Sequence, residues 1–567
     1  MKRNTSKLLA LAAGVSLIVA ACGGDDSGTT TEAPGTEAPS SEAPSSEAPS
    51  TDAPSDAAMT ITYDLADEAV WDDGSPITVA DFQCTWNAVL NTPGSISTSG
   101  YDKIIDVVAG DSDKQVIVTF SEVYAPWKGL FGGLVKSDSV ADCNDISGDF
   151  ADSIPFSGTE WKMDSWSTDG VTYVPNEAYW GPRKVSGYDQ LVMVPKPDTE
   201  IAALKAGEVD FIYPQFYAGI EDELADPNVS TKIEFGGDYE ALYMNMTGDR
   251  PFADPAVREA FYKSIDLDAL FAQIYTPIAP TGKLLTCGPI VPGDYCPEGI
   301  FGNKYDQAAA DKVMTDAGYA KGSDGIWAKD GKAVEIKWMI NAGNTRRENT
   351  QAYLIPLLAK AGFKLTADNC DAACVFQTRL PTGDYDLAMY ISTAPPDPAY
   401  LVSSFTCDNI PTAENDNQGQ NSQGWCNEEA SQALHDSDKT VDEAARADLI
   451  KSAITAMDTD YVLIPLFQFP KSGAYRKDLV GNVEGELNNF AAFNDTYQWT
   501  DLNGDGKVII GAEQWPECLN PVTECANSSW YVWTVANVLM PGVYRTTNDQ
   551  KYELTELMKS EPTVVTA

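Results

Sequence analysis

The chain has few basic residues and a single histidine, His435. Its 38 lysines and arginines stand against 84 aspartates and glutamates, which gives a formal net charge of -46. A chain this acidic repels nucleic acid and anionic lipid surfaces, so we expect no nucleic-acid function. The sequence also lacks the G-x-S-x-G motif of serine hydrolases and a zinc motif, which argues against a secreted hydrolase. We therefore expect a protein that is not an enzyme.

Beyond the first residues, no segment has the roughly 18 consecutive apolar residues of a membrane-spanning helix. The early apolar run from Leu8 to Ala21 is shorter, and it follows three basic residues, Lys2, Arg3 and Lys7. This pattern predicts a signal peptide over residues 1–21. The run ends in Val19-Ala20-Ala21-Cys22-Gly23, which resembles a lipobox, so we expect cleavage before Cys22 and a lipid on its sulfur. The alternative is an ordinary buried cysteine in an N-terminal helix.

Residues 31–55 repeat an acidic, proline-containing pentad and form no packed core. We interpret residues 22–58 as a tether that links the lipid to the folded body. The lipid is then the only membrane attachment, and the protein, which we expect to be a monomer, lies outside the cytoplasm. It would be held at the outer face of the cytoplasmic membrane, on the periplasmic side if an outer membrane is present.

The chain has 11 cysteines, and without Cys22 an even number is left in an oxidising compartment. Sequence alone does not fix the connectivity of disulfides. Proximity along the chain favours Cys287 with Cys296, Cys370 with Cys374, Cys407 with Cys426 and Cys518 with Cys525, which leaves Cys84 for Cys143. A metal site at Cys370 and Cys374 is the weaker interpretation, since no second pair follows and histidine is scarce.

The body of the chain mixes strand and helix patterns, which predicts an α/β class. Branched and aromatic residues predict strands at Gln115–Phe120, Gln190–Val194, Val334–Trp338 and Val508–Ile510. Apolar residues at spacings of three and four predict helices at Ala256–Ile265, Gln307–Ala317, Asn349–Ala361 and Asp442–Met457. Asp254-Pro255 and Asp306 are helix-start signals. A body of this length also predicts two or three domains.

The segment Trp71–Phe82 places a glycine turn before Pro76 and offers Thr78 as the N-cap of a helix. It resembles the W-x-DG-x-P-x-T-A-x-D segment of the bacterial extracellular solute-binding proteins of family 5. Further segments resemble that family in the same order, namely Leu242–Met246, Pro251–Asp266, Tyr305-Asp306, Ala317–Tyr319, Asp324–Trp327, Asn344–Glu348, Gly383–Leu387 and Asp397-Pro398.

The resemblance implies a two-lobed, periplasmic-binding-protein-like fold (type II, cluster C-like), with mixed sheets flanked by helices and a ligand cleft between the lobes. We expect lobe I at 59–238 and 466–567 and lobe II at 239–465. The implied function is capture of an oligopeptide or similar organic solute and its delivery to the permease of an ABC importer. The alternatives are a secreted hydrolase and a nickel- or chelate-binding member of the same family.

The resemblance also offers candidate ligand-binding residues: Tyr243, Asn245, Arg379, Asp397 and Trp515. Arg379 lies where some relatives bind a carboxylate, although it is equally interpreted as a surface arginine beside Asp384. The tyrosine, the asparagine and the tryptophan are as readily interpreted as core residues. In peptide-binding relatives an aspartate for the ligand amino group precedes the D-P motif, but Thr393–Pro396 occupies that stretch here.

The order of one segment departs from the family pattern. A strand with a following L-x-P turn normally begins the mature protein, whereas here the matching residues, Val508–Pro521, lie near the C-terminus. Glu561–Val564 looks like the segment that normally leads into Thr60–Tyr63. We interpret residues 507–567 as a circularly permuted unit of lobe I, and an appended strand unit is the alternative.

A possible calcium loop precedes that unit. Asp501, Asn503 and Asp505 match the first half of a D-x-N-x-D-G loop, but position 12 is Ala512 instead of glutamate. A solvated turn is the preferred interpretation. We therefore expect no cofactor, with calcium as the alternative.

Overall fold

The computed structural model describes residues 57–567 except 216, 218, 281, 298, 413–414, 416–418, 484–492 and 548–550. The predicted signal peptide, Cys22 and the tether up to residue 56 lie outside the described residues, so these remain predictions. Within the described part of the chain, every helix is too short or too polar to cross a membrane.

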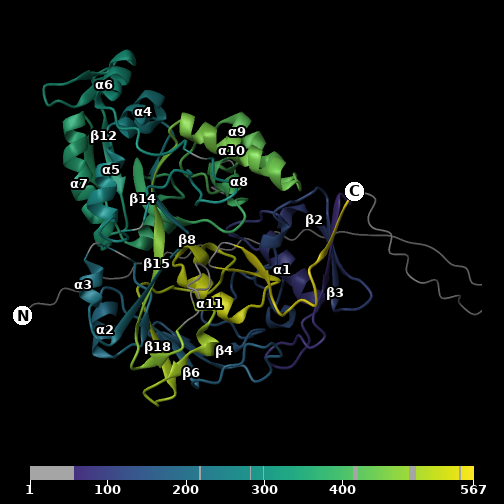
Figure 1. Cartoon of the computed structure of the whole chain (residues 1–567). Coiled ribbons are helices and arrows are strands. Elements are labelled where there is room, and N and C mark those ends of the chain that lie inside the picture. Colours follow the sequence, from purple (N-terminus) through teal and green to yellow (C-terminus); the bar gives the residue numbers. More distant parts are fainter. Residues whose placement is uncertain are drawn as a thin grey trace, which may run out of the picture. The chain divides into compact units, whose positions relative to one another are not determined.

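A ten-stranded mixed sheet runs through the molecule (Figure 1). Its order is β13 (Lys364–Ala367), β12 (Glu335–Met339), β14 (Leu387–Thr393), β8 (Val229–Met244), β15 (Leu463–Arg476), β7 (Phe211–Ile212), β18 (Lys507–Ala512), β6 (Gln190–Pro195), β5 (Gly170–Pro175) and β4 (Trp161–Ser167). The long strands β8 and β15 pair antiparallel from Leu463 opposite Tyr243 to Arg476 opposite Val229. Figure 1 shows them running from the part that holds α2 and β18 to the part that holds β12 and β14.

A four-stranded antiparallel sheet consists of β2 (Ile104–Ala109), β3 (Gln115–Phe120), β1 (Met59–Asp64) and β21 (Thr563–Thr566). Alternate residues of β1, beginning with Met59 and Ile61, are buried, as expected for a sheet with one covered face. Val564 lies directly opposite Ile61 across the β1–β21 ladder. Smaller ladders join β9 (Ala320–Lys321), β10 (Trp327–Lys329) and β11 (Lys332–Ala333), then β16 (Val480–Gly481) and β17 (Thr500–Asp501), and finally β19 (Tyr544–Thr546) and β20 (Tyr552–Leu554).

Seven of the eleven described helices begin at a residue whose side chain caps them. They are α1 (Val79–Asn91), α2 (Glu200–Ala206), α3 (Ile220–Leu224), α4 (Pro255–Lys263), α5 (Leu267–Leu270), α6 (Gln307–Asp316), α7 (Thr345–Ala361), α8 (Tyr400–Phe405), α9 (Glu428–Asp438), α10 (Glu443–Thr459) and α11 (Tyr531–Leu539). Thr78 and Asp81 form a capping box at the start of α1, while Asp254 and Asp306 cap α4 and α6. The four predicted helices and four predicted strands are all confirmed, with ends that differ by a few residues.

Buried side chains form several clusters that do not follow the predicted lobe boundaries. The largest joins β1, β3 and α1 to β18 and α11, and another joins α4, α7 and β12. Ala203, Leu204 and Leu224, from the region expected in lobe I, pack in the second of these clusters. Both expected boundaries fall inside β8 and β15, which are continuous strands. The lobe assignment remains a prediction at residue level.

The described residues contain five disulfides, namely the four pairings that proximity along the chain favours and the remaining pair, Cys84–Cys143. Cys84–Cys143 closes the longest loop, with a sequence separation of 59, and links α1 to the segment after β3. Cys518–Cys525 closes a short loop between β18 and α11. Because a cross-link removes entropy from the unfolded chain, the longer loop contributes more stability in the chain-entropy account.

Candidate functional site

A cavity of about 430 Å³ lies between segments from the two ends of the chain. Its walls come from α1, the turn at residues 128–135, α11, β19 and β20, and Pro395 adds a contact from the segment after β14. This volume lies within the range of small-molecule sites. We call it the main cavity.

Aromatic side chains supply much of its wall, namely Tyr101, Trp180, Trp533, Tyr544 and Tyr552. The rings of Tyr544 and Tyr552 lie 6.0 Å apart between centroids, in an edge-on arrangement. Tyr101 accepts a hydrogen bond from the Phe131 amide at 2.7 Å, and burial raises the pKa of its phenol to about 12. Rings of this kind offer apolar area with little conformational freedom to lose on binding, as suits an organic ligand.

Glycines bring the backbone of two segments together beside the cavity. A Cβ on Gly542 would lie 2.2 Å from the Gly132 carbonyl oxygen, and one on Gly158 would lie 2.5 Å from Pro541. Neither contact is compatible with a side chain. The two glycines therefore allow the turn at residues 128–135 and the start of the 541–557 segment to form one wall.

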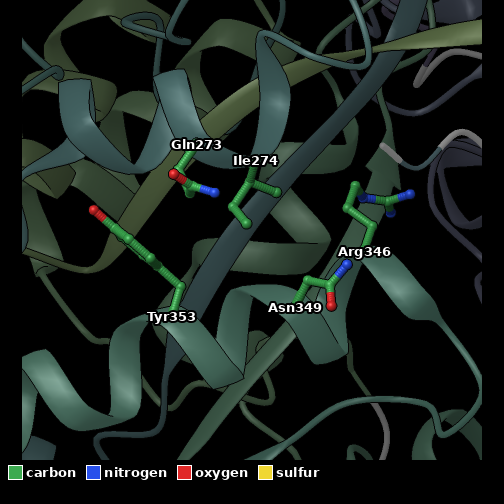
Figure 2. Close-up of a pocket in the computed structure, with 5 residues that line it drawn as sticks. All are labelled: Gln273, Ile274, Arg346, Asn349 and Tyr353. Atoms are coloured by element: carbon green, nitrogen blue, oxygen red, sulfur yellow. The ribbon is translucent and has the colours of Figure 1, made fainter. Parts of the chain in front are cut away.

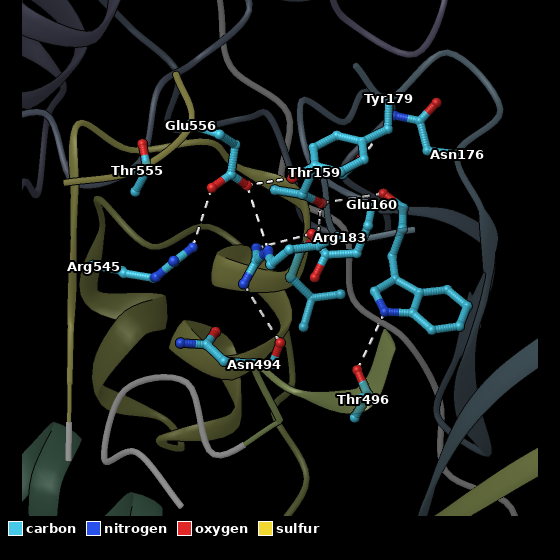
Figure 3. A network of polar contacts seen from close by, with 12 residues as sticks. Thr159, Glu160, Asn176, Tyr179, Arg183, Asn494, Thr496, Arg545, Thr555 and Glu556 are labelled. Carbon is cyan, nitrogen blue, oxygen red and sulfur yellow. Dashed lines mark hydrogen bonds and ion pairs between the residues drawn. The ribbon is translucent and has the colours of Figure 1, made fainter. Parts of the chain in front are cut away.

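Four charged residues, which we call the Arg183 network, form part of the wall and its backing (Figure 3). Arg183 lies 2.8 Å from a Glu160 oxygen and 3.4 Å from a Glu556 oxygen, while Arg545 lies 3.2 Å from the other oxygen of Glu556. Tyr179 donates a further hydrogen bond to Glu556. Burial raises the pKa of Glu160 to about 7, against the opposing effect of Arg183. The network fixes β20 and the residues after it to the 176–183 loop.

A second cavity, of about 330 Å³, lies beside α7 (Figure 2). Gln273 and Ile274 face Arg346, Asn349 and Tyr353 across it. The guanidinium of Arg346 is held by Glu240, with its Nη2 2.8 Å from Glu240 Oε1, so its charge is neutralised behind the cavity wall. This smaller space has one charged side chain on its wall, and that charge is already paired.

Glu240 and its partners form a cluster that is almost entirely shielded from solvent. Arg346 and Arg347 both contact Glu240 at 2.8 Å, and Tyr275 donates to it at 3.1 Å. The Glu240 side chain is 0% exposed. Although burial acts to raise it, the two guanidinium groups hold the pKa of Glu240 at about 2. We call these four residues the Glu240 cluster. It joins β8 to the first turn of α7.

Two of the predicted ligand-binding residues have internal partners. Tyr243 is 1% exposed, stacks on Tyr390 with centroids 4.0 Å apart and shares a 2.7 Å hydrogen bond with Ser392. Asn245 donates to the carbonyls of Gly383 and Tyr385 at 3.0 and 2.9 Å. These contacts are those of core residues.

The other three predicted ligand-binding residues also contact protein groups. Arg379 binds Asp368 at 2.6 Å and lies 3.3 Å from Asp384, whereas Asp397 makes a two-pronged ion pair with Arg446 at 2.6 Å. Trp515 stacks on a neighbouring indole and is half-buried. None of the five residues lines either of the two cavities described above. Their role in binding remains a prediction.

In the possible calcium loop, for which a solvated turn is the preferred interpretation, the carboxylates accept hydrogen bonds from the backbone of the same loop. Asp501 accepts hydrogen bonds from the amides of Asn503, Gly504 and Gly506, and Asp505 accepts from Lys507. This is the arrangement of a closed turn whose carboxylate oxygens serve its own backbone. A cation would have to compete with those bonds.

The Arg183 network was not predicted from the sequence. A local signal exists only at Tyr179–Arg183, where two aromatic residues and an arginine surround Gly181 and Pro182. The partners are distant in sequence, since Tyr179 and Glu556 are 377 positions apart. Only the fold brings them together.

Comparisons with known proteins connect this geometry to a family. The profile described as "Bacterial extracellular solute-binding proteins, family 5 Middle" matches residues 47–412. A probable monoacyl phosphatidylinositol tetramannoside-binding protein, LpqW of Mycobacterium tuberculosis, is 26% identical over 38% of this chain and 34% of its own length. The oligopeptide-binding protein OppA of Mycobacterium bovis is 23% identical over 59% of this chain and 58% of its own.

The chain thus aligns with between a third and three-fifths of the length of these curated relatives. Among solved structures, the periplasmic EDTA-binding protein EppA superposes with a TM-score of 0.68. That match is 22% identical and covers 78% of this chain and 84% of the other. At this identity the structural likeness establishes the fold, a periplasmic-binding-protein fold.

Proposed function

The chain belongs to the bacterial extracellular solute-binding proteins of family 5, and on that premise we propose that it captures an organic solute for an ABC importer. An oligopeptide or a solute of similar size binds in the main cavity, whose lining comes from the region expected in lobe I together with Pro395 from the region expected in lobe II, and is handed to the permease. The protein performs no chemistry on it. The observation that carries this proposal is the main cavity, whose volume and aromatic walls suit an organic solute.

Contacts between regions on either side of β8 and β15 support a closed form. The Ala125 amide donates to the Asp438 carbonyl at 2.6 Å, and Lys439 lies 2.7 Å from Glu122. A solute that touches both regions shifts the balance toward such a form by its difference in affinity for the open and closed states. Solute binding and closure of the protein are then thermodynamically coupled.

A metal chelate is the second candidate solute, because one structural neighbour is named an EDTA-binding protein. Among the described residues, the grouping of possible metal ligands is Cys407, Cys426 and Glu428, and its two cysteines are joined in a disulfide. His435 lies on α9, partly exposed, 3.1 Å from Asp408. A metal would therefore arrive with its carrier, and the carrier would be what the cavity recognises.

The attachment to the membrane and the permutation complete the proposal. A lipid on Cys22 and the tether would hold the body at the outer face of the cytoplasmic membrane, as a monomer. The pairing of Val564 with Ile61 and the position of β18 between β6 and β7 support a circular permutation. The tether would then enter within a segment that is continuous in relatives.

A thermal-shift screen of peptides, amines, sugars and chelated metals tests the function. A solute present at about 100 times its Kd should add about 2.7 kcal/mol to the free energy of unfolding. The expected result is a rise in Tm with one chemical class. If no solute raises the Tm and the protein hydrolyses an ester or peptide, the binding function is wrong and the hydrolase alternative is right.

A further inference from the structure

The turn at residues 128–135 lines the main cavity and includes two amides that have no acceptor among the described residues. Phe131 has a φ of 55°, and its amide is used by the Tyr101 hydroxyl at 2.7 Å. The next two residues, Gly132 and Gly133, line the cavity, and among the described residues neither amide donates to a protein acceptor. Successive amides next to a left-handed residue form a concavity that attracts anions.

Lys128 places a positive charge on the same turn. Its ammonium nitrogen lies 5.6 Å from the centroid of the Tyr544 ring and 5.7 Å from that of Trp127. Within the described part of the chain, no carboxylate lies at ion-pair distance from it. Lys128 is exposed and lines the cavity, so a solute there can reach its charge.

A third donor comes from another part of the wall. The indole nitrogen of Trp180 is buried and has no hydrogen-bond acceptor, although Trp180 lines the main cavity. Nearly all buried donors in native proteins have acceptors, and a ligand can supply one that the protein does not. The Trp180 indole N–H and the amides of Gly132 and Gly133 therefore all lack a hydrogen-bond acceptor among the described residues.

The two arginines nearby differ from these donors, because protein carboxylates already pair with them. Arg183 has Glu160 and Glu556, and Arg545 has Glu553 and Glu556. The excess of donors therefore lies at Lys128, at the Gly132–Gly133 amides and at Trp180.

We propose that the solute carries an anionic, acceptor-rich group, a carboxylate or a phosphate, and that these donors bind it. Lys128 supplies the charge, and the neutral N–H groups supply directed hydrogen bonds. The body of the solute lies against the aromatic wall, which includes Trp533 and Tyr552. This inference rests on the proposed function and names the class of solute for the same cavity.

Calorimetry on the full chain tests this with three probes: the tripeptide Ala-Phe-Ala with a free carboxylate, the same tripeptide as its C-terminal amide, and phenyl phosphate. The free acid or the phosphate should bind about tenfold more tightly than the amide, since hydrogen bonds to charged groups are the stronger ones. The two anionic probes distinguish a carboxylate ligand from a phosphate ligand.

Two variants locate the site. Lys128→Gln should weaken binding of the favoured anion about five- to tenfold and leave the amide unchanged. Lys477→Gln removes an exposed lysine away from the cavity and should change neither. Trp180→Phe keeps the ring, removes the N–H, and should weaken the anion about threefold.

Equal binding of the acid, the phosphate and the amide overturns the inference, as does an equal effect of the two lysine variants. If a neutral or cationic solute from the thermal-shift screen binds while both anions fail, the inference is wrong and the proposed function stands. If no solute of any class binds, both are wrong.

Discussion

The Glu240 cluster and the Arg183 network both place carboxylates between two arginines, but they differ in where they lie. Glu240 is 0% exposed and sits on β8, in the middle of the ten-stranded sheet. Glu556 is 19% exposed and lines the main cavity. The same chemistry is enclosed by the protein in one place and faces the main cavity in the other.

The two clusters therefore differ in what the loss of a charge does. A buried ion pair contributes little net stability when intact, but removal of one partner leaves a charge in a medium that solvates it poorly. At Glu240, which is fully buried, such a change affects folding first, although its partner Arg346 lines the smaller cavity. At Glu556 it also changes the charge of the cavity wall, and therefore the affinity for a charged solute.

The largest effect is expected from Glu240→Gln, which removes the buried carboxylate that Arg346 and Arg347 both contact at 2.8 Å. The free energy of unfolding should fall by about 3–5 kcal/mol, as measured by urea denaturation at neutral pH. Glu335→Gln, in the exposed pair with Lys364, is the control and should leave the midpoint unchanged. A loss in Glu240→Gln no larger than that of the control would contradict the enclosed role of the cluster.

Glu556→Gln should produce a smaller loss of stability and a change in binding. We expect a decrease of about 1–3 kcal/mol, because Glu556 is partly exposed and Arg183 keeps Glu160 as a partner. Removal of a negative charge from the wall should tighten binding of the favoured anionic probe by about three- to tenfold. Urea denaturation measures the change in stability, and calorimetry measures the change in affinity. In Glu240→Gln, the comparison variant, the affinity of the folded protein should stay the same. Weaker anion binding in Glu556→Gln would contradict the proposed effect of the Glu556 charge on the cavity.

Asp438 provides a third case, a buried carboxylate oxygen without a hydrogen-bond partner. Burial, then Asp397, raises its pKa to about 7, against Arg446 and Lys103, with Asp102 also nearby and Tyr124 facing it. Since the ordinary pKa of aspartate is about 3.9, the folded state binds this proton more tightly than the unfolded state. The stability that this proton contributes is full below about pH 4 and is lost as the pH rises through about 7.

Asp438→Asn should therefore remove the decline in Tm between about pH 4 and pH 7 that this group causes. The variant should be more stable than the wild type above pH 7, and Tm measured across pH tests this. Asp448→Asn, at an exposed position on α10, is the control and should follow the wild-type curve. Parallel curves for the wild type and Asp438→Asn would contradict the predicted shift.

The smallest effect is expected from calcium, because the Asp501 loop uses its oxygens for its own backbone. Millimolar calcium should move the Tm by no more than about 1 °C, which corresponds to negligible occupancy. A clear rise in Tm that disappears in Asp505→Asn would show instead that the loop is a metal site.

The elements of the fold were predictable because their signals are local. Thr78 and Asp81 are three residues apart, so a capping box is visible in the sequence, and Asp254 and Asp306 signal helix starts in the same way. The disulfides follow mainly from short separations along the chain. Each of these depends on residues that are neighbours before folding begins.

The site was less predictable because its residues are distant in sequence. Tyr243 and Asn245 lie in a recognisable strand motif, but β8 is covered on both edges by β14 and β15, which the motif does not reveal. Nothing local marks Glu556 as a partner of Arg183, or Gly132 as a neighbour of Gly542. Charge pairing and backbone contact across hundreds of residues are properties of the packed molecule.

We propose that the main cavity holds the solute, and Trp533 on α11 lines that cavity. Substitution of Trp533 therefore tests the proposal. The solute with the largest thermal shift should be titrated by calorimetry into the wild type, Trp533→Ala and Glu240→Gln, each shown to be folded by circular dichroism. The account predicts one site per chain and a loss of affinity of at least about tenfold in Trp533→Ala only. Unchanged affinity in Trp533→Ala would place the binding site elsewhere and contradict the account.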